Sequence, residues 1–247
     1  MSISLSTIIE KLKSLKLHGM KNSVTARCDE ATKNQLAPIE FLSLLIEDEI
    51  LDKEQRRYER RYKKASFKGV KTIENFDFGF NPKINQKQIR DLATCQFVKE
   101  RSPVIIVGPC GTGKTHIAQA LGHAALQQGY DVICTTQSKL SEELKIAQAT
   151  NTYEKKLKSL AKIDVLIIDD FGLKPLRTPE DENMHDIISE RYEVSTTIVT
   201  SNLSLDEWQH AFSNQLLGVA TADRIRHNAH IVLLEGKGYR KPRTNKK

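Results

Sequence analysis

Long apolar runs are missing from this sequence, and no stretch approaches the roughly 20 consecutive residues that a membrane helix requires. The first residues carry no basic cluster and no long apolar block, which argues against a secretory signal. The four cysteines are widely spread, without a C-x-x-C pair or a histidine at metal-ligand spacing, so a disulfide framework and a zinc site are disfavoured. We therefore expect a protein of the reducing cytosol with no membrane partner.

Acidic residues are outnumbered, since 38 lysines and arginines stand against 31 aspartates and glutamates and give a net charge of +7. This balance favours a polyanionic partner, with nucleic acid the first choice. Hydrophobic residues make up 39% of the 247 residues. That content and length suffice for one α/β domain with a small additional domain.

A glycine-rich segment organises the chain. It follows a short apolar run, Val104–Val107, and precedes a helix-like stretch at 116–128, which is the strand–loop–helix context of a P-loop. Its residues match G-x-x-x-x-G-K-T in full, and we assign all of them to nucleotide binding: Gly108, Pro109, Cys110, Gly111, Thr112, Gly113, Lys114 and Thr115. Backbone N–H groups and the helix N-terminus bind phosphate oxygens, Lys114 reaches the β- and γ-phosphates, and Thr115 offers its hydroxyl to Mg²⁺. The segment predicts binding of a nucleoside triphosphate.

Two acids end a second apolar run, Ile163–Asp170. Asp169 is suited to hold Mg²⁺, and Asp170 is suited to polarise a water for in-line attack on the γ-phosphorus. A further run ends in Asn202, which either orients the attacking water, contacts the γ-phosphate, or is an ordinary turn residue.

Strand and helix patterns alternate through most of the chain. Five short apolar runs, at 104–107, 131–135, 163–170, 195–202 and 230–234, are predicted strands. Such alternation is typical of a parallel sheet covered by helices on both faces, with functional groups beyond the carboxyl ends of the strands. The expected fold class is therefore α/β, a three-layer α/β/α core around a five-stranded parallel sheet. One helix is expected over 84–100, and Trp208 and Phe212 are expected to be packing residues.

Residues 1–68 are predicted to form a small all-helical domain that binds DNA or a partner, and residues 69–247 the α/β domain with a basic tail. Residues 29–35 are either a polar connection or a frayed helical stretch. A long helix begins near Pro38. Its expected inward positions follow helical spacing and are Phe41, Leu42, Leu45, Ile46 and Ile50.

That helix becomes basic after Asp52. We interpret its positive residues as a surface that binds DNA phosphates, namely Arg56, Arg57, Arg60, Arg61, Lys63 and Lys64. The alternative is an exposed basic helix end favoured by the helix macrodipole. If about six of these charges met phosphates, the logarithm of DNA affinity would fall with the logarithm of salt with a slope near −5.

Two further segments each allow two interpretations. Three phenylalanines among turn residues at 73–82 either contact the nucleotide base or clip the two domains together. An arginine within Asp223–Asn228 either reaches a neighbouring subunit's γ-phosphate, or pairs with Asp223 or faces solvent.

Four segments together resemble the AAA+ ATPases of the DnaC/IstB group: Gly108–Thr115, Val165–Gly172, Thr200–Asn202 and Asp223–Asn228. The segment Gly238–Lys241 also resembles that group's C-terminus. Within the group, the IstB-type transposition helpers are the most similar, through the helical N-terminal region, Phe76–Phe78 with Asn81-Pro82, and Asn183–Glu190. The similarity spans nearly the whole chain.

The resemblance implies a cytoplasmic bacterial ATPase with ATP and Mg²⁺ as cofactors. Such a protein forms an ATP-dependent homo-oligomer on double-stranded DNA, remodels or bends the DNA, and presents it to a partner transposase. It also implies that the usual AAA+ helical lid is absent or truncated.

The resemblance further implies roles for single residues. Lys114 and Thr115 belong to Walker A, Asp169 and Asp170 to Walker B, and Asn202 resembles sensor 1. The catalytic set is then completed by an arginine finger, for which the candidates are Arg224 and, as the alternative, Arg226, while Arg240 is a candidate for sensor 2.

Two rival functions share parts of this pattern. A DnaC-like helicase loader would have the same fold and site with a replicative helicase as partner. A P-loop small-molecule kinase would need an acceptor pocket and an arginine-bearing lid, and the sequence has no insertion for such a lid.

Overall fold

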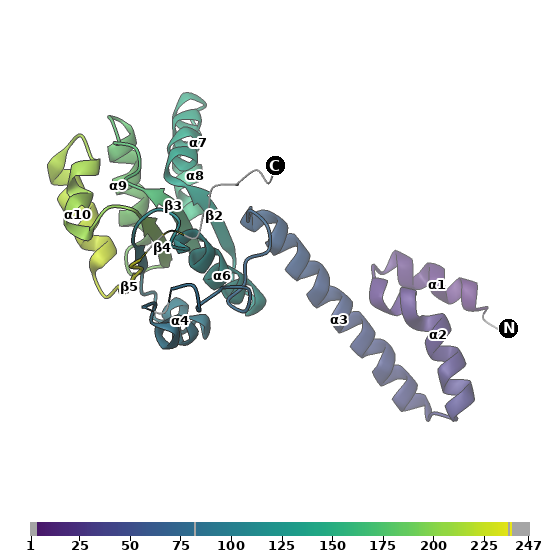
Figure 1. Cartoon of the computed structure of the whole chain (residues 1–247). Helices are drawn as coiled ribbons and strands as arrows, with labels where there is room; N and C mark the ends of the chain where they lie inside the picture. Colours follow the sequence, from purple (N-terminus) through teal and green to yellow (C-terminus); the bar gives the residue numbers. More distant parts are fainter. Residues whose placement is uncertain (1–3, 82, 237, 239–247) are drawn as a thin grey trace, which may run out of the picture. The chain divides into compact units, whose positions relative to one another are not determined.

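The computed structural model describes residues 4–81, 83–236 and 238, and Figure 1 labels their helices and strands. The chain divides into two compact units, Met1–Arg60 and Arg61–Lys247, and the division lies inside helix α3, Pro38–Ala65. Over the described ranges, no helix is both long and apolar enough to cross a membrane. The first unit is helical, and the second contains the sheet.

Three helices build the first unit: α1 Leu5–Ser14, α2 His18–Asn34 and the first part of α3. Ser4 begins α1 as a side-chain cap, because its hydroxyl accepts the Thr7 N–H at 3.3 Å. Of the stretch 29–35, residues 29–34 are helical and belong to α2. The residue that precedes α2 makes no side-chain cap, so the first N–H groups of this helix require another acceptor.

Glu49 on α3 supplies that acceptor. Its Oε2 accepts the N–H groups of Gly19 at 2.7 Å and of Met20 at 3.2 Å. Gly19 permits the close approach, since an added Cβ would lie 2.6 Å from the Cα of Glu49. Burial raises the pKa of the Glu49 carboxyl, but hydrogen bonds from Met20, Lys53 and Gly19 outweigh burial, and the pKa lies below its usual value of 4.5. Glu49 thereby fastens α2 to α3.

The expected inward face of α3 is partly wrong. Leu42, Ile46 and Ile50 are 48%, 43% and 50% exposed. Leu45 is buried, as expected, and Glu49, one helical turn later, is buried on the same face of the helix. Because this face of α3 turns the Glu49 carboxylate toward the N-terminus of α2, the apolar residues on the neighbouring face point outward.

Replacing Glu49 with alanine is expected to destabilise the α2–α3 contact by about 2 kcal/mol, since two buried N–H groups would lose their acceptor. Hydrogen exchange of the α2 amides in the full chain should accelerate about 30-fold. The matched control is Glu47→Ala, which removes an exposed carboxylate of the same helix. Equal exchange rates in the Glu49 variant and the wild type would contradict this function of Glu49.

The same contact should weaken in acid. The Arg27 guanidinium lowers the pKa of Asp48 to about 2, and the pKa of Glu49 is also lowered. Because both folded-state pKa values are depressed, the stabilisation is present above the unfolded values and is lost as the pH falls through the folded ones. Helix content of this unit should therefore decline between about pH 4 and pH 2 in a circular-dichroism titration, and less steeply in Glu49→Gln.

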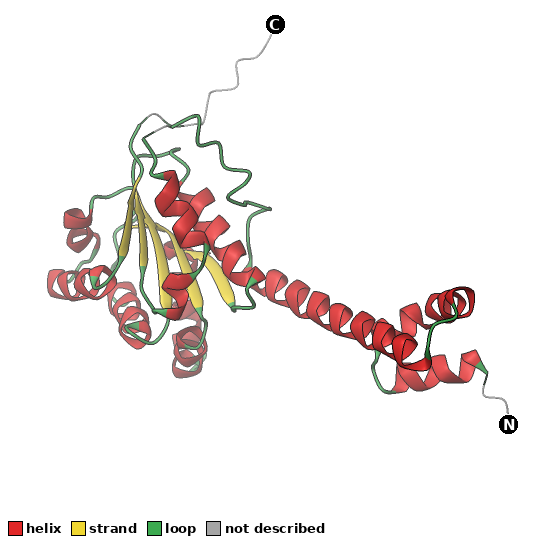
Figure 2. Cartoon of the chain, turned by 90° about the horizontal axis from the view of Figure 1, so that it is seen from below, coloured by secondary structure: helices red, strands yellow, loops and turns green. Residues whose placement is uncertain are grey.

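A five-stranded parallel sheet forms the second unit, in the order β2-β3-β4-β1-β5. Its strands are β1 Val104–Val107, β2 Val132–Thr136, β3 Val165–Phe171, β4 Thr196–Ser201 and β5 His230–Leu233. The connecting helices are α4 Gln86–Ala93, α5 Gln96–Lys99, α6 Lys114–Gln127, α7 Gln137–Ala149, α8 Tyr153–Ala161, α9 Glu180–Arg191, the 3₁₀ helix η1 Leu205–Ala211 and α10 Gln215–Arg226. Figure 2 shows helices on both faces of the sheet, which confirms the predicted three-layer α/β/α architecture.

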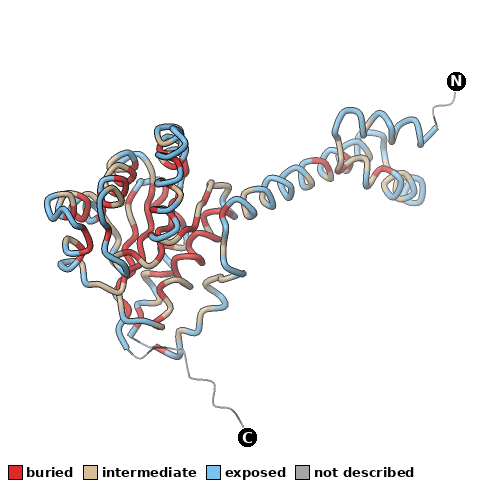
Figure 3. The backbone as a smooth tube through the Cα atoms, turned by 90° about the horizontal axis from the view of Figure 1, so that it is seen from above, coloured by how far each residue is buried: buried red, intermediate tan, exposed pale blue. Residues whose placement is uncertain are grey.

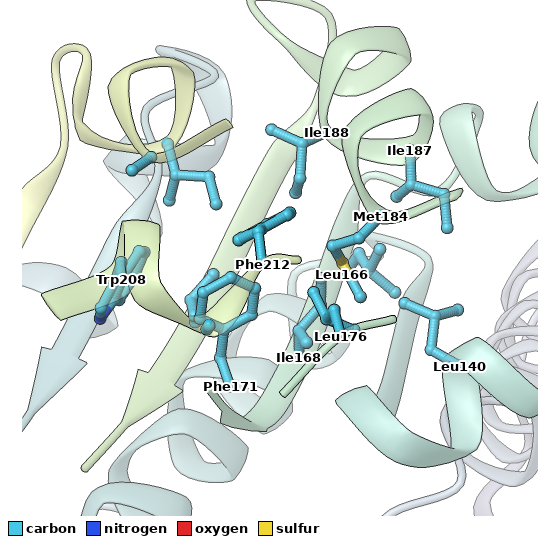
Figure 4. Packing of buried hydrophobic residues seen from close by; sticks show 14 of the residues in the cluster. Leu140, Leu166, Ile168, Phe171, Leu176, Met184, Ile187, Ile188, Trp208 and Phe212 are labelled. Carbon is cyan, nitrogen blue, oxygen red and sulfur yellow. The ribbon is translucent and has the colours of Figure 1, made fainter. Parts of the chain in front are cut away.

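Helix α6 covers one face of the sheet, where Gly122 lets it approach closely: an added Cβ would lie 2.7 Å from Cδ1 of Ile167. Buried residues of this unit gather along the strands and α6 (Figure 3). The other face packs under α7–α10 and η1, in a buried cluster that includes Phe171, Trp208 and Phe212 (Figure 4). The Phe171 and Trp208 rings lie 4.7 Å apart, in keeping with the expected packing role of Trp208.

The single helix expected over 84–100 is wrong. Cys95 has a positive φ of 58°, and the chain breaks there into α4 and α5. The break lets both pieces bury apolar residues, Ile89 and Leu92 from α4 and Phe97 and Val98 from α5. In the residues described, β5 is the last helix or strand.

Candidate nucleotide site

The P-loop joins the carboxyl end of β1 to the N-terminus of α6. Gly113 has a φ of 100° and packs against the Phe76 ring, from which an added Cβ would lie only 2.6 Å. A Cβ on Gly108 would overlap with the carbonyl oxygen of Leu234. Glycine is therefore required at both positions, for conformation and for space. The turn leaves backbone N–H groups of the loop and the first turn of α6 available for phosphate oxygens.

The Lys114 side chain is held inside this loop. It is 6% exposed, and its Nζ donates to the carbonyl oxygens of Gly108 at 2.7 Å and Pro109 at 2.8 Å. Thr112 adds a hydrogen bond from its Oγ1 to the Pro109 oxygen at 2.9 Å. An ammonium held by two backbone carbonyls of the P-loop is a suitable binding group for the terminal phosphates.

Asp169 in β3 lies beside the P-loop threonine. The hydroxyl of Thr115 donates to its Oδ1 at 2.9 Å, and the hydroxyl of Thr200 in β4 donates to the same atom. Asp169 is only 5% exposed. A carboxylate and a hydroxyl at this spacing fit the oxygen-ligand preference of Mg²⁺. The described residues hold no group of three metal-ligating side chains, so the remaining ligands would come from phosphate and water.

Asp170 lies at an irregularity of the strand. The register between β3 and β4 shifts between Ile168 and Phe171, and Asp170 has a φ of 57°. Its N–H donates to Thr200 Oγ1 at 3.1 Å. Neighbouring side chains of a regular strand point to opposite faces, and a bulge changes this alternation. Both Asp169 and Asp170 line the same pocket. β3 continues to Phe171, so the expected end of the strand at the two acids is wrong.

Asn202 follows directly after β4, and its Nδ2 donates to Cys110 Sγ at 3.3 Å. Since β4 lies between β1 and β3, the P-loop, Asp169 and Asn202 meet at one edge of the sheet. One pocket contains all of them, and its other wall consists of residues that precede α4: Lys68, Lys71, Asn75, Phe76, Asp77, Phe80 and Asn81. Phe76 thus lies at the predicted nucleotide site.

Sequence reasoning assigned no role to two buried residues of this site. Thr200 is fully buried and contacts both acids, accepting from the Asp170 backbone and donating to Asp169. Gln137 at the start of α7 accepts the Gly172 N–H at 2.6 Å and donates to the Lys174 oxygen at 2.9 Å, which fixes the loop after β3.

Comparison with known proteins identifies the family. The model of the family described as "IstB-like ATP binding protein" matches residues 10–247 of this chain. A relative from Mycobacterium tuberculosis, named for ATP binding and for its place in an insertion sequence, is 34% identical over 97% of this chain and 96% of its own. The chain belongs to the IstB-like ATP-binding proteins. It is thus an ATP-binding protein of the IstB/DnaC type.

Solved structures agree with this assignment at the level of the fold. DnaI aligns with a TM-score of 0.56 at 22% identity, over 68% of this chain and 90% of its own. The DnaC helicase loader aligns with a TM-score of 0.53 at 22% identity, over 66% of this chain and 96% of its own. The IstB-like chain thus has the AAA+ fold.

Arg224 lies away from its own P-loop. It is half-buried on α10, donates to the Ala220 oxygen at 3.2 Å, and lines a cleft with Arg191, Tyr192 and His227. The cleft also includes the residues just before β1 and β4, so it lies at the amino ends of the strands, opposite the P-loop edge.

The other predicted arginines lie elsewhere. Arg226 pairs with Asp206 at 3.6 Å and does not line this cleft. Arg240 lies outside the described residues.

The basic residues of α3 differ in their surroundings. Three of them pair with carboxylates: Arg56 with Asp52 at 2.6 Å, and Arg61 and Lys64 with Asp131 at 3.2 and 3.8 Å. The other three, Arg57, Arg60 and Lys63, are exposed and make no ion pair with a described residue.

The cysteines of this IstB-like protein should differ in reactivity. Cys110 is exposed in the P-loop, and Cys28 is half-buried. Burial raises the pKa of Cys95 and of Cys134 to about 11, which suppresses their thiolates.

A maleimide should therefore label Cys110 first. Labelling of Cys110 should abolish ATP binding, and bound ATP should slow the labelling. Cys110→Ser should be insensitive, and equal labelling of Cys110 with and without ATP would contradict this placement of the loop. Mass spectrometry of the peptides measures the extent of labelling at each cysteine.

Proposed function

We propose that this IstB-like protein is an Mg²⁺-dependent ATPase that assembles on double-stranded DNA with ATP, bends or remodels the DNA, and recruits a partner transposase. The observation that carries the proposal is the single pocket that joins the P-loop to Asp169, Asp170 and Asn202. Its family relatives are named for insertion sequences, which supports a role in transposition.

Each of the pocket's residues is proposed to have a separate role in ATP hydrolysis. Mg²⁺, held by Thr115 and Asp169, would neutralise charge between the terminal phosphates. Lys114 stabilises the charge that develops there, and Asp170 accepts a proton from the attacking water. Asn202 orients that water from the end of the neighbouring strand.

The arginine finger is proposed to act between subunits. An arginine at the opposite edge of the sheet from the P-loop can contact a phosphate only in another copy of the chain. Arg224 lines the cleft at that edge, whereas Arg226 is engaged with Asp206, so the geometry favours Arg224. Head-to-tail contacts of this kind generate rings or spirals. ATP occupancy would thereby control both assembly and turnover.

DNA is proposed to contact α3. Arg57, Arg60 and Lys63 are exposed and form no ion pair among the described residues, so they can bind phosphates directly. The paired residues must first leave their carboxylates. The expected salt slope per subunit is therefore about −3, smaller than the value near −5 for the full set of six.

Two alternative functions differ from the proposed one in their partner or substrate. A DnaC-like helicase loader has the same AAA+ fold, but relatives that match nearly the whole chain are named for insertion sequences, which favours the transposase. A small-molecule kinase would need an acceptor pocket for its second substrate, whereas the family relatives are named for insertion sequences.

Duplex binding followed by fluorescence anisotropy tests the DNA part of the proposal. ATP should tighten binding relative to ADP, and the triple variant Arg57→Gln, Arg60→Gln, Lys63→Gln should bind weakly with a flatter salt dependence. The control neutralises Lys155, Lys158 and Lys162, on and just after α8. Equal affinity of the triple variant and wild type at every salt concentration would overturn the assignment of DNA to α3.

A further inference from the structure

The segment that leads from α3 to the sheet is fixed against the nucleotide pocket. The Thr72 carbonyl oxygen lies 2.8 Å from Nε2 of His116, the residue that follows Thr115 in α6. The Phe76 ring packs on Gly113, and its centroid lies 5.2 Å from that of the His116 ring. Two anchors on the first turn of α6 therefore set the position of residues 72–76, and Lys71 is adjacent to the first anchor.

Two lysines of this segment line the nucleotide pocket. Lys68 and Lys71 share this lining with Thr115 and Asp169. Lys71 directly precedes Thr72, whose carbonyl oxygen lies against His116, and His116 follows Thr115. The segment therefore lies next to a residue proposed to hold Mg²⁺, where the γ-phosphate of a bound triphosphate would lie.

Both ammonium groups are available for a ligand. Over the described residues, neither lysine forms an ion pair, whereas Lys64 and Lys83 nearby pair with Asp131 and Glu235. Lys68 is exposed and Lys71 half-buried, so neither pays a large desolvation penalty when it contacts an anion. This wall also contains Asp77, whose Oδ1 accepts the Phe80 N–H. Two lysines against this one carboxylate leave the wall positive, which suits a polyphosphate.

We propose that Lys68 and Lys71 bind the γ-phosphate side of ATP within the same subunit, and that the segment after α3 thereby distinguishes ATP from ADP. The inference deepens the proposed function and rests on it, because it needs the triphosphate in this pocket. ATP carries one phosphoryl group and more negative charge than ADP, so the lysines favour ATP. Lys68 lies three residues past the end of α3 at Ala65, so contact with ATP restrains the start of this segment.

Equilibrium binding of ATP and ADP in the presence of Mg²⁺ tests the assignment. Lys71→Met and Lys68→Met should each weaken ATP binding about tenfold and ADP binding about threefold, and the double variant should lose most of the preference for ATP. Lys71→Arg retains the charge and should remain near wild type. The matched control is Lys155→Met, an exposed lysine on α8 outside the pocket.

Limited trypsin digestion of the wild-type protein gives a second readout that needs no variant. Trypsin cleaves after lysine, so ATP should slow cleavage after Lys68 and Lys71 at least several-fold, ADP should slow it less, and cleavage after Lys155 should not change. Lys114→Ala, which removes the P-loop ammonium, should lose this protection.

The outcomes separate the two proposals. If the wild type binds ATP, but the double variant binds it equally well and ATP does not protect Lys68 and Lys71, the lysine assignment is wrong and the ATP site stands. If the wild type binds no ATP at all, the proposed function fails, and this inference fails with it.

Discussion

Asp170→Asn should lower the rate of ATP hydrolysis by at least about 100-fold, the usual contribution of a general base. Asparagine has nearly the same shape and retains the backbone N–H that donates to Thr200. It cannot accept a proton from water, however. ATP affinity should stay within about threefold of wild type, because Asp170 is assigned to the attacking water and not to the phosphates.

The neighbouring acid provides the matched control. Asp169→Asn should raise the Mg²⁺ concentration needed for ATP binding, since it weakens the carboxylate that accepts from Thr115 and Thr200. The measurements are phosphate release at saturating ATP and binding of a fluorescent ATP analogue across a Mg²⁺ titration. Normal turnover by Asp170→Asn would exclude it as the base, and normal Mg²⁺ dependence in Asp169→Asn would exclude that residue as the metal ligand.

Arg224→Ala and Lys114→Ala should each abolish most ATP turnover, by about 1,000-fold, and a mixture of the two proteins should regain activity. In an assembly with head-to-tail contacts, an Arg224→Ala subunit retains its P-loop, and an adjacent Lys114→Ala subunit supplies the missing arginine. A one-to-one mixture should therefore recover up to about a quarter of wild-type turnover, because both conditions are met at one interface in about four.

Arg226→Ala is the control for this experiment. Arg226 lies on α10 with Arg224, and its replacement breaks the pair with Asp206 of η1 but should retain most of the activity. The mixture must be assayed with DNA and above the concentration at which the wild type assembles. A mixture that remains as inactive as its components would mean that Arg224 does not act on a neighbour's ATP.

The fold was predictable from local patterns, and so was the approximate composition of the site. Apolar runs ending in G-x-x-x-x-G-K-T and in two acids indicate parallel strands, and parallel strands bring their carboxyl ends to one edge. The sheet, its helical layers and the family were confirmed. The roles of Lys114, Asp169 and Asp170 follow from the motif and stay predictions.

The contacts that were missed are long-range. Nothing in the local pattern of β4 indicates that Thr200 bridges to both acids of β3, because the register shift at Asp170 arises only when the strands pair. The break at Cys95 likewise depends on two helices burying separate residues. On α3, apolar spacing predicted the wrong face, since a buried carboxylate holds the partner helix.

Lys68 shows a second reason why the sequence alone could not predict the whole site. In the sequence it comes shortly after the basic residues of α3 that were assigned to DNA. In the structure it lines the nucleotide pocket. A charge run therefore predicts an anionic partner, but the tertiary structure decides which anion each residue can reach.

Light scattering with size separation tests the central claim most directly, that ATP controls assembly on DNA. The protein would be mixed with a duplex of defined length and measured with ATP, with ADP and without nucleotide, using Asp170→Asn to keep ATP intact. We expect large protein–DNA complexes with ATP only. A chain that stays monomeric with ATP and duplex, or that forms the same complexes in all three conditions, would contradict the account.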